Sequence, residues 1–118
     1  KARQAAADYY DQAFQNIQEL SIPARQANST HVFHQYTLLV NNGKRDGLLA
    51  YLTEKGIPTG VYYPVPLYQQ NAFAKYYNGS PLPVTEALCQ SVISLPMHTE
   101  MDEELLGYIT GTVCNFFQ

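Results

Sequence analysis

Charge is scarce in this chain. Only 14% of its 118 residues are charged, against about 25% in an ordinary globular domain. The formal net charge is −3 and no basic cluster occurs, so the electrostatic footprint of a nucleic-acid binder is missing. No apolar run approaches the roughly 20 residues that span a bilayer, and the polar N-terminal segment does not match a signal peptide. These absences predict a cytoplasmic protein that binds neither nucleic acid nor a membrane.

Cysteine is also rare. Cys89 and Cys114 fall in different predicted helices, and no CxxC occurs. This spacing argues against a zinc site or a redox pair and predicts two buried free thiols. His31 and His34 form the remaining ligand-like pair, but residues three apart on a strand point to opposite faces. We therefore expect no metal site.

The usual catalytic motifs are missing as well. The chain has no Gly-rich phosphate loop, no GxSxG elbow and no paired carboxylates at a strand end. Its four lysines fall in amphipathic or loop contexts where we expect exposure to solvent, whereas a Schiff-base lysine needs a desolvated pocket. The chain on its own is therefore not expected to be a complete enzyme. Because it begins at Lys1 without a methionine, we interpret it as a piece of something longer.

What the chain does contain predicts one domain. Its 46% hydrophobic content supports a single core at this length. Its ten tyrosines suit either a surface that binds a partner or the rim of the core. Helical spacing predicts helices over residues 1–20, 43–56, 71–77, 83–92 and from 99 onward, and β-type patterns predict strands over 32–40, 59–63 and 91–95.

Helices that alternate with short strands indicate an α/β fold, a small two-layer domain in which helices cover a roughly three-stranded sheet. We expect residues 1–20 to form a linking helix and residues 21–118 to form the domain itself. In detail, Asn42 could cap the second helix, Gly56 ends it, and residues 99–102 (TEMD) match a capping box. The apolar face of the last helix is predicted to include Leu105 and Ile109.

Residues 55–70 (KGIPTGVYYPVPLYQQ) form the least generic stretch of the sequence. They contain three prolines, two glycines and three tyrosines. Prolines make such a turn rigid, and binding groups on a loop need a rigid scaffold to position them. This stretch is therefore a candidate site. His34 and Tyr36 are predicted to share a strand face and could bind a sugar hydroxyl or a phosphate oxygen, or could be satisfied core residues.

Four segments in order resemble one family: residues 31–37 (HVFHQYT), 45–52 (RDGLLAYL), 56–67 (GIPTGVYYPVPL) and 94–97 (SLPM), the last followed by an acidic helix start. They are similar to the C-terminal small domain of the DegT/StrS family of pyridoxal-phosphate-dependent sugar aminotransferases. The third segment resembles the family signature GI-x-TG-x-x-YP-x-PL. The resemblance covers essentially the whole chain.

The resemblance implies a fold-type-I homodimer that moves an amino group, usually from glutamate, to a nucleotide-linked keto-sugar. The cofactor lysine would belong to a large N-terminal domain that this chain lacks, so the chain alone is expected to bind no pyridoxal phosphate and to be inactive. The small domain would close over the active site and supply part of the sugar-nucleotide pocket.

Carried over by position, the expected substrate contacts are His34, Gln35, Tyr36, Tyr62 and Tyr68. Family members often have histidine at the last two positions and proline where this chain has Asn71. A tyrosine keeps a hydrogen-bonding tip but cannot act as a base near neutral pH. The two strand motifs resemble those of members that act on UDP-linked 3-keto sugars in lipopolysaccharide or O-antigen synthesis.

Two alternatives stay open on the sequence. The first is a non-catalytic module that binds a sugar nucleotide or another partner. The second is a pyridoxal-phosphate-dependent sugar dehydratase of the same fold, in which histidine replaces the cofactor lysine. Both would be decided by residues outside this chain.

Overall fold

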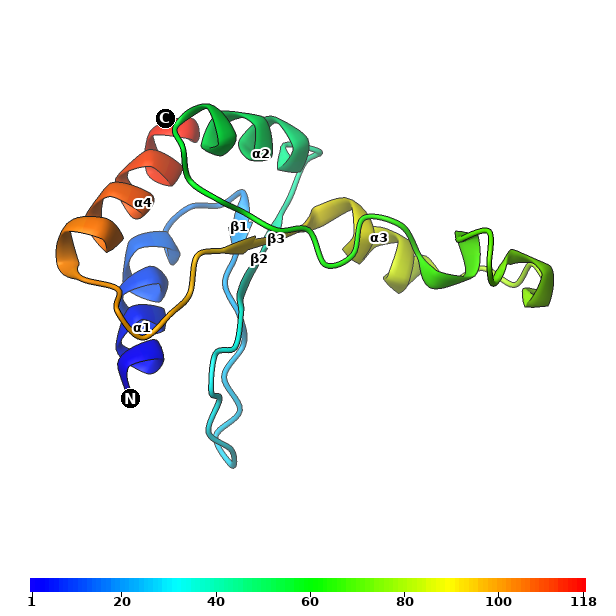
Figure 1. The fold of residues 1–118 in the computed structure, drawn as a ribbon, viewed down its shortest axis with the longest axis horizontal. Coiled ribbons are helices and arrows are strands. Elements are labelled where there is room, and N and C mark those ends of the chain that lie inside the picture. Colours follow the sequence, from blue (N-terminus) through cyan, green and yellow to red (C-terminus); the bar gives the residue numbers. More distant parts are fainter.

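A computed structural model describes all 118 residues. Four α-helices and a short three-stranded sheet make up the fold, together with two 3₁₀ helices (Figure 1). In chain order the elements are α1 (Ala2–Phe14), β1 (Leu20–Ser21), β2 (Tyr36–Val40), α2 (Arg45–Glu54), η1 (Leu67–Gln69), η2 (Ala74–Tyr76), α3 (Pro83–Ser91), β3 (Val92–Leu95) and α4 (Glu103–Phe116). The predicted α/β fold with a three-stranded sheet is confirmed.

The sheet is antiparallel and has the order β1-β2-β3. The sequence pattern predicted a strand over residues 59–63. The structure has β1 as the third member of the sheet instead. Within that stretch Gly60 makes only an isolated bridge to Ser94. Pro58 and Pro64 flank the bridge, and proline has no N–H to extend a ladder. A bridge therefore forms where a strand was expected.

Helix α1 is shorter than predicted and ends at Phe14. The apolar spacing continues through Ile17 and Leu20, but their N–H groups bond to Phe14 and Ile17 carbonyls in tight turns, and Leu20 then joins the sheet. The predicted division between residues 20 and 21 falls within β1. The buried face of α1 packs along α4, so this helix is part of the core.

The helix ends also differ in detail from the prediction. Asn42 lies in a turn with φ of 59°, and α2 begins after Lys44 without a side-chain cap. Gly56 has φ of 72°, the left-handed conformation expected of a residue that ends a helix. At α4 the cap is Asp102, whose carboxylate accepts the Leu105 N–H at 2.8 Å. The helix thus begins later than the 99–102 box predicted.

The late start of α4 shifts its buried face. Leu106 and Ile109 are buried, whereas Leu105 is exposed. Helices α1, α2 and α4 and the sheet enclose a core of 17 apolar side chains. We call these three helices and the sheet the body. The buried members are Ala6, Ala7, Tyr10, Phe14, Leu20, Phe33, Tyr36, Leu38, Val40, Leu48, Leu52, Ile57, Ile93, Leu95, Leu106, Ile109 and Val113.

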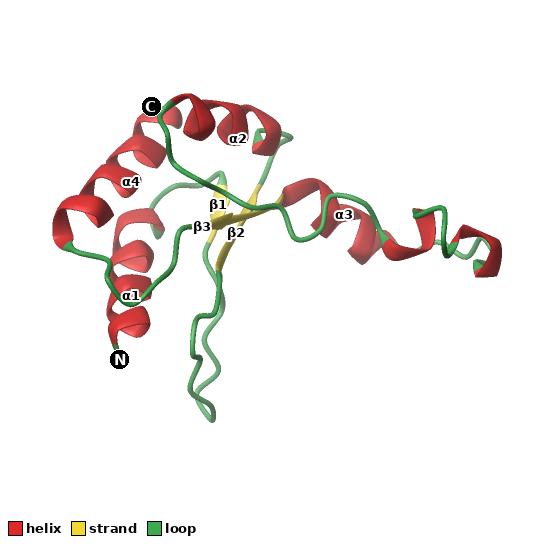
Figure 2. Cartoon of the chain, in the orientation of Figure 1, coloured by secondary structure: helices red, strands yellow, loops and turns green.

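Residues 61–91 project from the body as an extended segment, which we call the arm (Figures 1 and 2). The two 3₁₀ helices η1 and η2 occupy the region where a short helix over 71–77 was predicted. Helix α3 forms as predicted, but none of its residues is buried. Its apolar stripe, which includes Val84 and Leu88, therefore faces solvent.

Both cysteines are free and half-buried. None of the helices combines the length and the apolar character that crossing a membrane would require.

Candidate functional site

A hollow of about 380 Å³ lies where the arm leaves the body. Three segments that are distant in sequence line it, namely residues 34–35, 58–62 without Val61, and 94–97. Paired main-chain hydrogen bonds between Gly60 and Ser94, of 3.0 and 2.7 Å, hold two of these segments together. The Ser94 hydroxyl is 2.7 Å from the Thr37 hydroxyl of β2. The sheet thus fixes one wall of the hollow.

Gly60 lets the Tyr62 side chain lie against the main chain. A Cβ atom at Gly60 would lie 2.5 Å from the Tyr62 ring, which is far inside van der Waals contact. Tyr62 is half exposed and lines the hollow. A side chain at residue 60 would therefore displace the tyrosine.

Thr59 also lines the hollow. Its hydroxyl oxygen is buried and makes no hydrogen bond. Buried polar atoms are nearly always paired, so this oxygen is an exception next to the hollow.

His34 and Gln35 reach the hollow because the chain turns sharply before β2. Phe33 has φ of 47° and its side chain is buried, so the strand begins at Tyr36 and not at residue 32. His34 and Gln35 consequently lie outside the strand, exposed and lining the hollow. The prediction that His34 shares a strand face with Tyr36 is therefore wrong.

Tyr36 lies in the core instead. Its side chain is fully buried, and its hydroxyl donates to an Asp11 carboxylate oxygen at 2.7 Å. Burial, and then this hydrogen bond, raise the pKa of Tyr36 above its ordinary value. In this conformation the hydroxyl is satisfied within the body, which matches the alternative of a satisfied core residue.

Tyr68 lies in the arm, away from the hollow. Its hydroxyl donates to the Glu86 carboxylate, and its ring stacks on Tyr77 at a centroid distance of 4.1 Å. Of the five expected contact residues, the structure brings three to the hollow: His34, Gln35 and Tyr62. That any of the five contacts substrate stays a prediction.

Thr59 and Ser94 are site residues that the sequence reasoning did not single out. Both stand inside motifs that carried the resemblance, residues 56–67 and 94–97. Their position in those motifs was the available signal. What the sequence did not reveal is that the Gly60–Ser94 bridge joins the two motifs.

The chain's lysines do not fit the covalent attachment of pyridoxal phosphate. All four are exposed, as the sequence predicted. Lys44 pairs with Glu19 at 3.0 Å, while Lys55 and Lys75 lie over tyrosine rings at 5.4 and 4.8 Å. A Schiff-base lysine is typically desolvated in a pocket. The four lysines lie on the surface instead.

Comparison with known proteins gives one consistent result. The model of the DegT/DnrJ/EryC1/StrS aminotransferase family matches residues 1–114. A protein of Geobacillus stearothermophilus named pleiotropic regulatory protein is 37% identical over 98% of this chain and 31% of its own length. The UDP-N-acetyl-3-dehydro-alpha-D-glucosamine 3-aminotransferase of Acidithiobacillus ferrooxidans is 36% identical over 94% of this chain and 29% of its own length.

The fold agrees with this result. The crystal structure of a DegT DnrJ EryC1 StrS aminotransferase from Brucella abortus superposes with a TM-score of 0.86 at 35% identity. The match covers 98% of this chain and 30% of that one. The chain thus spans less than a third of the length of the relatives it matches. On the strength of a family model that matches nearly every residue, the chain belongs to the DegT/DnrJ/EryC1/StrS aminotransferase family.

Proposed function

We propose that this chain is the C-terminal domain of a sugar aminotransferase that moves an amino group from glutamate to a nucleotide-linked keto-sugar. The observation that carries the proposal is the hollow, which His34, Gln35, Thr59 and Tyr62 help to line. It occurs in a chain of an aminotransferase family. These groups suit a sugar, because hydroxyls both donate and accept hydrogen bonds.

In the proposed complex the chain's residues bind and orient the sugar. Gln35 offers both a donor and an acceptor, and His34 offers one of each when neutral. The Tyr62 ring supplies an apolar face. We assign no proton transfer to Tyr62, because a tyrosine hydroxyl is not a base near neutral pH.

The cofactor chemistry would lie outside this chain. Pyridoxal phosphate supplies an electron sink when it is bound, and we propose that a large domain of a homodimeric parent protein holds it. The exposed lysines described above support this division of labour. The small domain would then close over the sugar and exclude water.

The arm supports a role within a larger assembly. Its exposed apolar side chains include Tyr63, Leu67, Tyr76 and Val84, each more than half exposed. Contiguous exposed apolar patches mark interaction sites. Since the relatives are about three times longer than this chain, we propose that their additional domain covers the arm.

We further propose that the substrate is a UDP-linked 3-keto sugar of lipopolysaccharide or O-antigen synthesis, handled in the cytoplasm. Two observations support this choice. The strand motifs of the chain resemble those of such members, and the Acidithiobacillus relative is named for a UDP-linked 3-dehydro amino sugar.

The decisive measurement is the visible absorption spectrum of the protein expressed from its intact gene. We expect a cofactor band that fades when glutamate is added and returns with a UDP-linked 3-keto sugar. A band that is indifferent to glutamate would contradict an aminotransferase and favour the dehydratase. The isolated chain serves as the control and should show no discrete, saturable cofactor adduct.

One observation favours a second candidate, a binding or regulatory module without catalysis. The Geobacillus relative is named a pleiotropic regulatory protein. A colourless intact protein that still binds UDP-N-acetylglucosamine would support this candidate and contradict the aminotransferase.

The role of the hollow can be tested separately. In the intact protein, His34→Ala should raise the KM for the sugar nucleotide and leave the cofactor band unchanged, since it removes a hydrogen bond worth about 1–3 kcal/mol. His98→Ala is the matched control, because His98 is an exposed histidine that does not line the hollow. Loss of bound cofactor in His34→Ala would contradict the assignment.

A further inference from the structure

The loop over residues 22–35 connects β1 to β2 and contains no helix or strand. It extends away from the sheet and returns beside it (Figure 1). Its last two residues, His34 and Gln35, line the hollow. Main-chain ladders do not hold this loop, so its position depends on side-chain contacts with the body.

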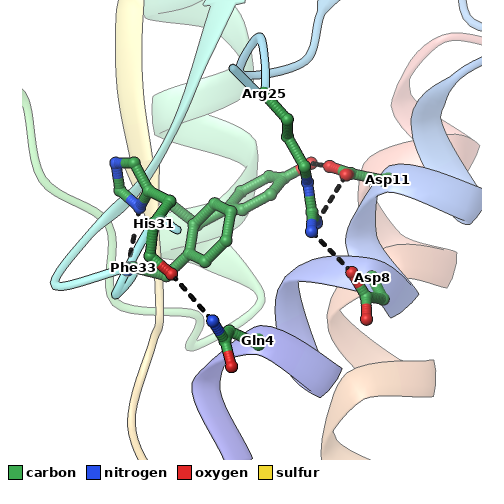
Figure 3. A network of polar contacts seen from close by, with 7 residues as sticks. Gln4, Asp8, Asp11, Arg25, His31 and Phe33 are labelled. Atoms are coloured by element: carbon green, nitrogen blue, oxygen red, sulfur yellow. Dashed lines mark hydrogen bonds and ion pairs between the residues drawn. The ribbon is translucent and has the colours of Figure 1, made fainter. Parts of the chain in front are cut away.

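Two aspartates of α1 hold the outgoing half of the loop. The Arg25 guanidinium lies 2.7 Å from an Asp8 oxygen and 2.6 Å from an Asp11 oxygen. The other Asp11 oxygen accepts the hydroxyl hydrogen of Tyr36, the first residue of β2. Figure 3 shows Arg25 lying between the two carboxylates. Asp11 thus joins both ends of the loop to a single turn of α1.

The returning half of the loop folds onto the same arginine. The Arg25 guanidinium carbon lies 4.8 Å from the centroid of the Phe33 ring, and Phe33 is 2% exposed. His31 supports the turn, because its Nδ1 accepts the Phe33 N–H at 2.8 Å. Gln4 of α1 donates to the His31 carbonyl at 3.2 Å (Figure 3).

Phe33 needs this support. A positive φ is uncommon for a residue with a bulky side chain, and it persists only where the surroundings hold it. With the Phe33 ring turned into the body, His34 and Gln35 face the hollow instead. The direction of these two side chains therefore follows from contacts that lie on the opposite side of the loop.

We propose that Asp11 and Arg25 are positioning residues that set the sugar affinity of the hollow by holding Phe33, and through it His34 and Gln35, in place. The inference rests on the proposed function. Neither Asp11 nor Arg25 lines the hollow, so any effect on substrate must pass through the loop. Loss of one hydrogen bond to the sugar would weaken its binding by about tenfold.

Matched variants separate positioning from general charge effects. Asp11→Asn weakens the pair with Arg25 but keeps an acceptor for the Tyr36 hydroxyl. Asp8→Asn removes an equal charge from the same arginine, but Asp8 is 56% exposed and does not contact Tyr36. Arg25→Gln provides a second way to break the ion pair between Arg25 and Asp11, at a side chain that is 39% exposed.

The experiment uses the intact protein and two measurements. Hydrogen exchange should show loss of protection at the Phe33 amide by about tenfold in Asp11→Asn and Arg25→Gln, with the amides of α4 unchanged. Steady-state kinetics with glutamate and a UDP-linked 3-keto sugar should show KM for the sugar raised about tenfold and kcat within twofold. Asp8→Asn should change both quantities by less than threefold.

Three results would overturn the proposal: full protection of the Phe33 amide in Asp11→Asn, lost protection with unchanged KM, or an equal KM effect in Asp8→Asn. An intact wild-type protein that transfers no amino group would overturn the proposed function instead. The exchange measurement would then still decide whether Asp11 and Arg25 hold the loop, because it does not depend on substrate.

Discussion

The body and the arm of this chain are stabilised in different ways. In the body, 17 apolar side chains from three helices, the sheet and the adjoining loops are buried against one another. In the arm, the helices η1, η2 and α3 have no buried residue at all. Burial of apolar surface is the dominant favourable term in folding. The body therefore has what it needs to fold alone, whereas the arm takes its shape from local contacts and from its attachment to the body.

Two local contacts define the arm. The Tyr68 ring stacks on Tyr77 while its hydroxyl donates to Glu86 of α3, so two separate stretches of the arm are joined. At the base, the buried guanidinium of Arg45 donates to the carbonyls of Cys89 and Val92, each at 3.1 Å. Arg45 belongs to α2, so this side chain fastens the arm to the body.

The largest expected effect comes from a matched pair of leucines. Leu38 in β2 is fully buried and Leu88 in α3 is 41% exposed. We expect Leu38→Ala to lower the free energy of unfolding by about 3 kcal/mol, since it removes buried methyl groups and leaves a cavity. Leu88→Ala should lower it by about 0.5 kcal/mol or less. Urea denaturation of the chain measures both.

Comparable losses in the two variants would contradict the division into body and arm. In the intact protein we propose that a further domain covers the arm. Leu88→Ala should therefore lower the stability of the intact protein more than it lowers that of the isolated chain.

The second largest effect is expected at the base of the arm. Arg45→Met removes both donors while keeping much of the side-chain volume. Because hydrogen bonds from a charged group contribute about 1.5–3 kcal/mol, we expect unfolding to become easier by about 2 kcal/mol. Hydrogen exchange should also rise from Cys89 to Val92. Arg45→Lys is the control, since lysine keeps the charge but lacks the planar fork. Unchanged exchange there in Arg45→Met would show that the arm is held by something else.

The smallest effect on global stability is expected from Tyr68, and it depends on pH. The hydrogen bond to Glu86 raises the pKa of Tyr68 above its ordinary value of 10.0. The fold favours protonated Tyr68, so the hydrogen bond contributes its full stability below the ordinary pKa of 10.0. This stability is lost as the pH rises through the raised pKa of the folded state. We therefore expect amide protection in the arm to fall above pH 10 in a way that depends on the Tyr68 hydroxyl.

The body should lose stability over the same pH range through its own tyrosines. Burial raises the pKa of Tyr10 and, together with a hydrogen bond, that of Tyr36, so the contribution of these protonated hydroxyls is also lost as the pH rises. Tyr68→Phe is the control, because its arm should be less protected at neutral pH and should lose the dependence that the hydroxyl supplies. The pH dependence of the body should be unchanged in Tyr68→Phe, and its loss there would contradict the independence of body and arm.

Much of the body was predictable from the sequence because its elements follow simple periodic patterns. The apolar spacing of Leu48 and Leu52 and the stop at Gly56 predicted α2, and the structure confirms it. Pro83 at the start of α3 and the β-branched run of β3 were equally informative. In these segments local propensity and packing agree, which is why pattern reasoning succeeded.

The errors occurred where long-range contacts override local pattern. Residues 59–63 are rich in β-formers, but Pro58 and Pro64 limit their pairing with the distant Ser94 to one bridge. Phe33 was predicted to continue the strand, and its contact with Arg25 turns it into the core instead. Ser94 is far from residue 60 in sequence, and Arg25 lies eight residues before Phe33, so no local pattern predicts either contact.

The candidate site was predicted in part for the same reason. His34, Gln35 and Tyr62 were chosen by position in family motifs, and the structure places them around one hollow. Tyr36 and Tyr68 were chosen in the same way, but the structure places Tyr36 in the core and Tyr68 in the arm. Position within a motif thus brought three of the five residues to the hollow, because it does not reveal where the strand begins or how the arm folds.

The pairing of α1 with α4 has a consequence for folding during synthesis. The Tyr10 hydroxyl donates to the Pro96 carbonyl at 2.9 Å, and α1 lies along the last helix of the chain. Helix α1 is synthesised before α4 and must therefore wait for it before its apolar face is covered. Contacts between distant segments form late and slow folding. The apolar face of α1 is thus exposed to aggregation until α4 has been synthesised.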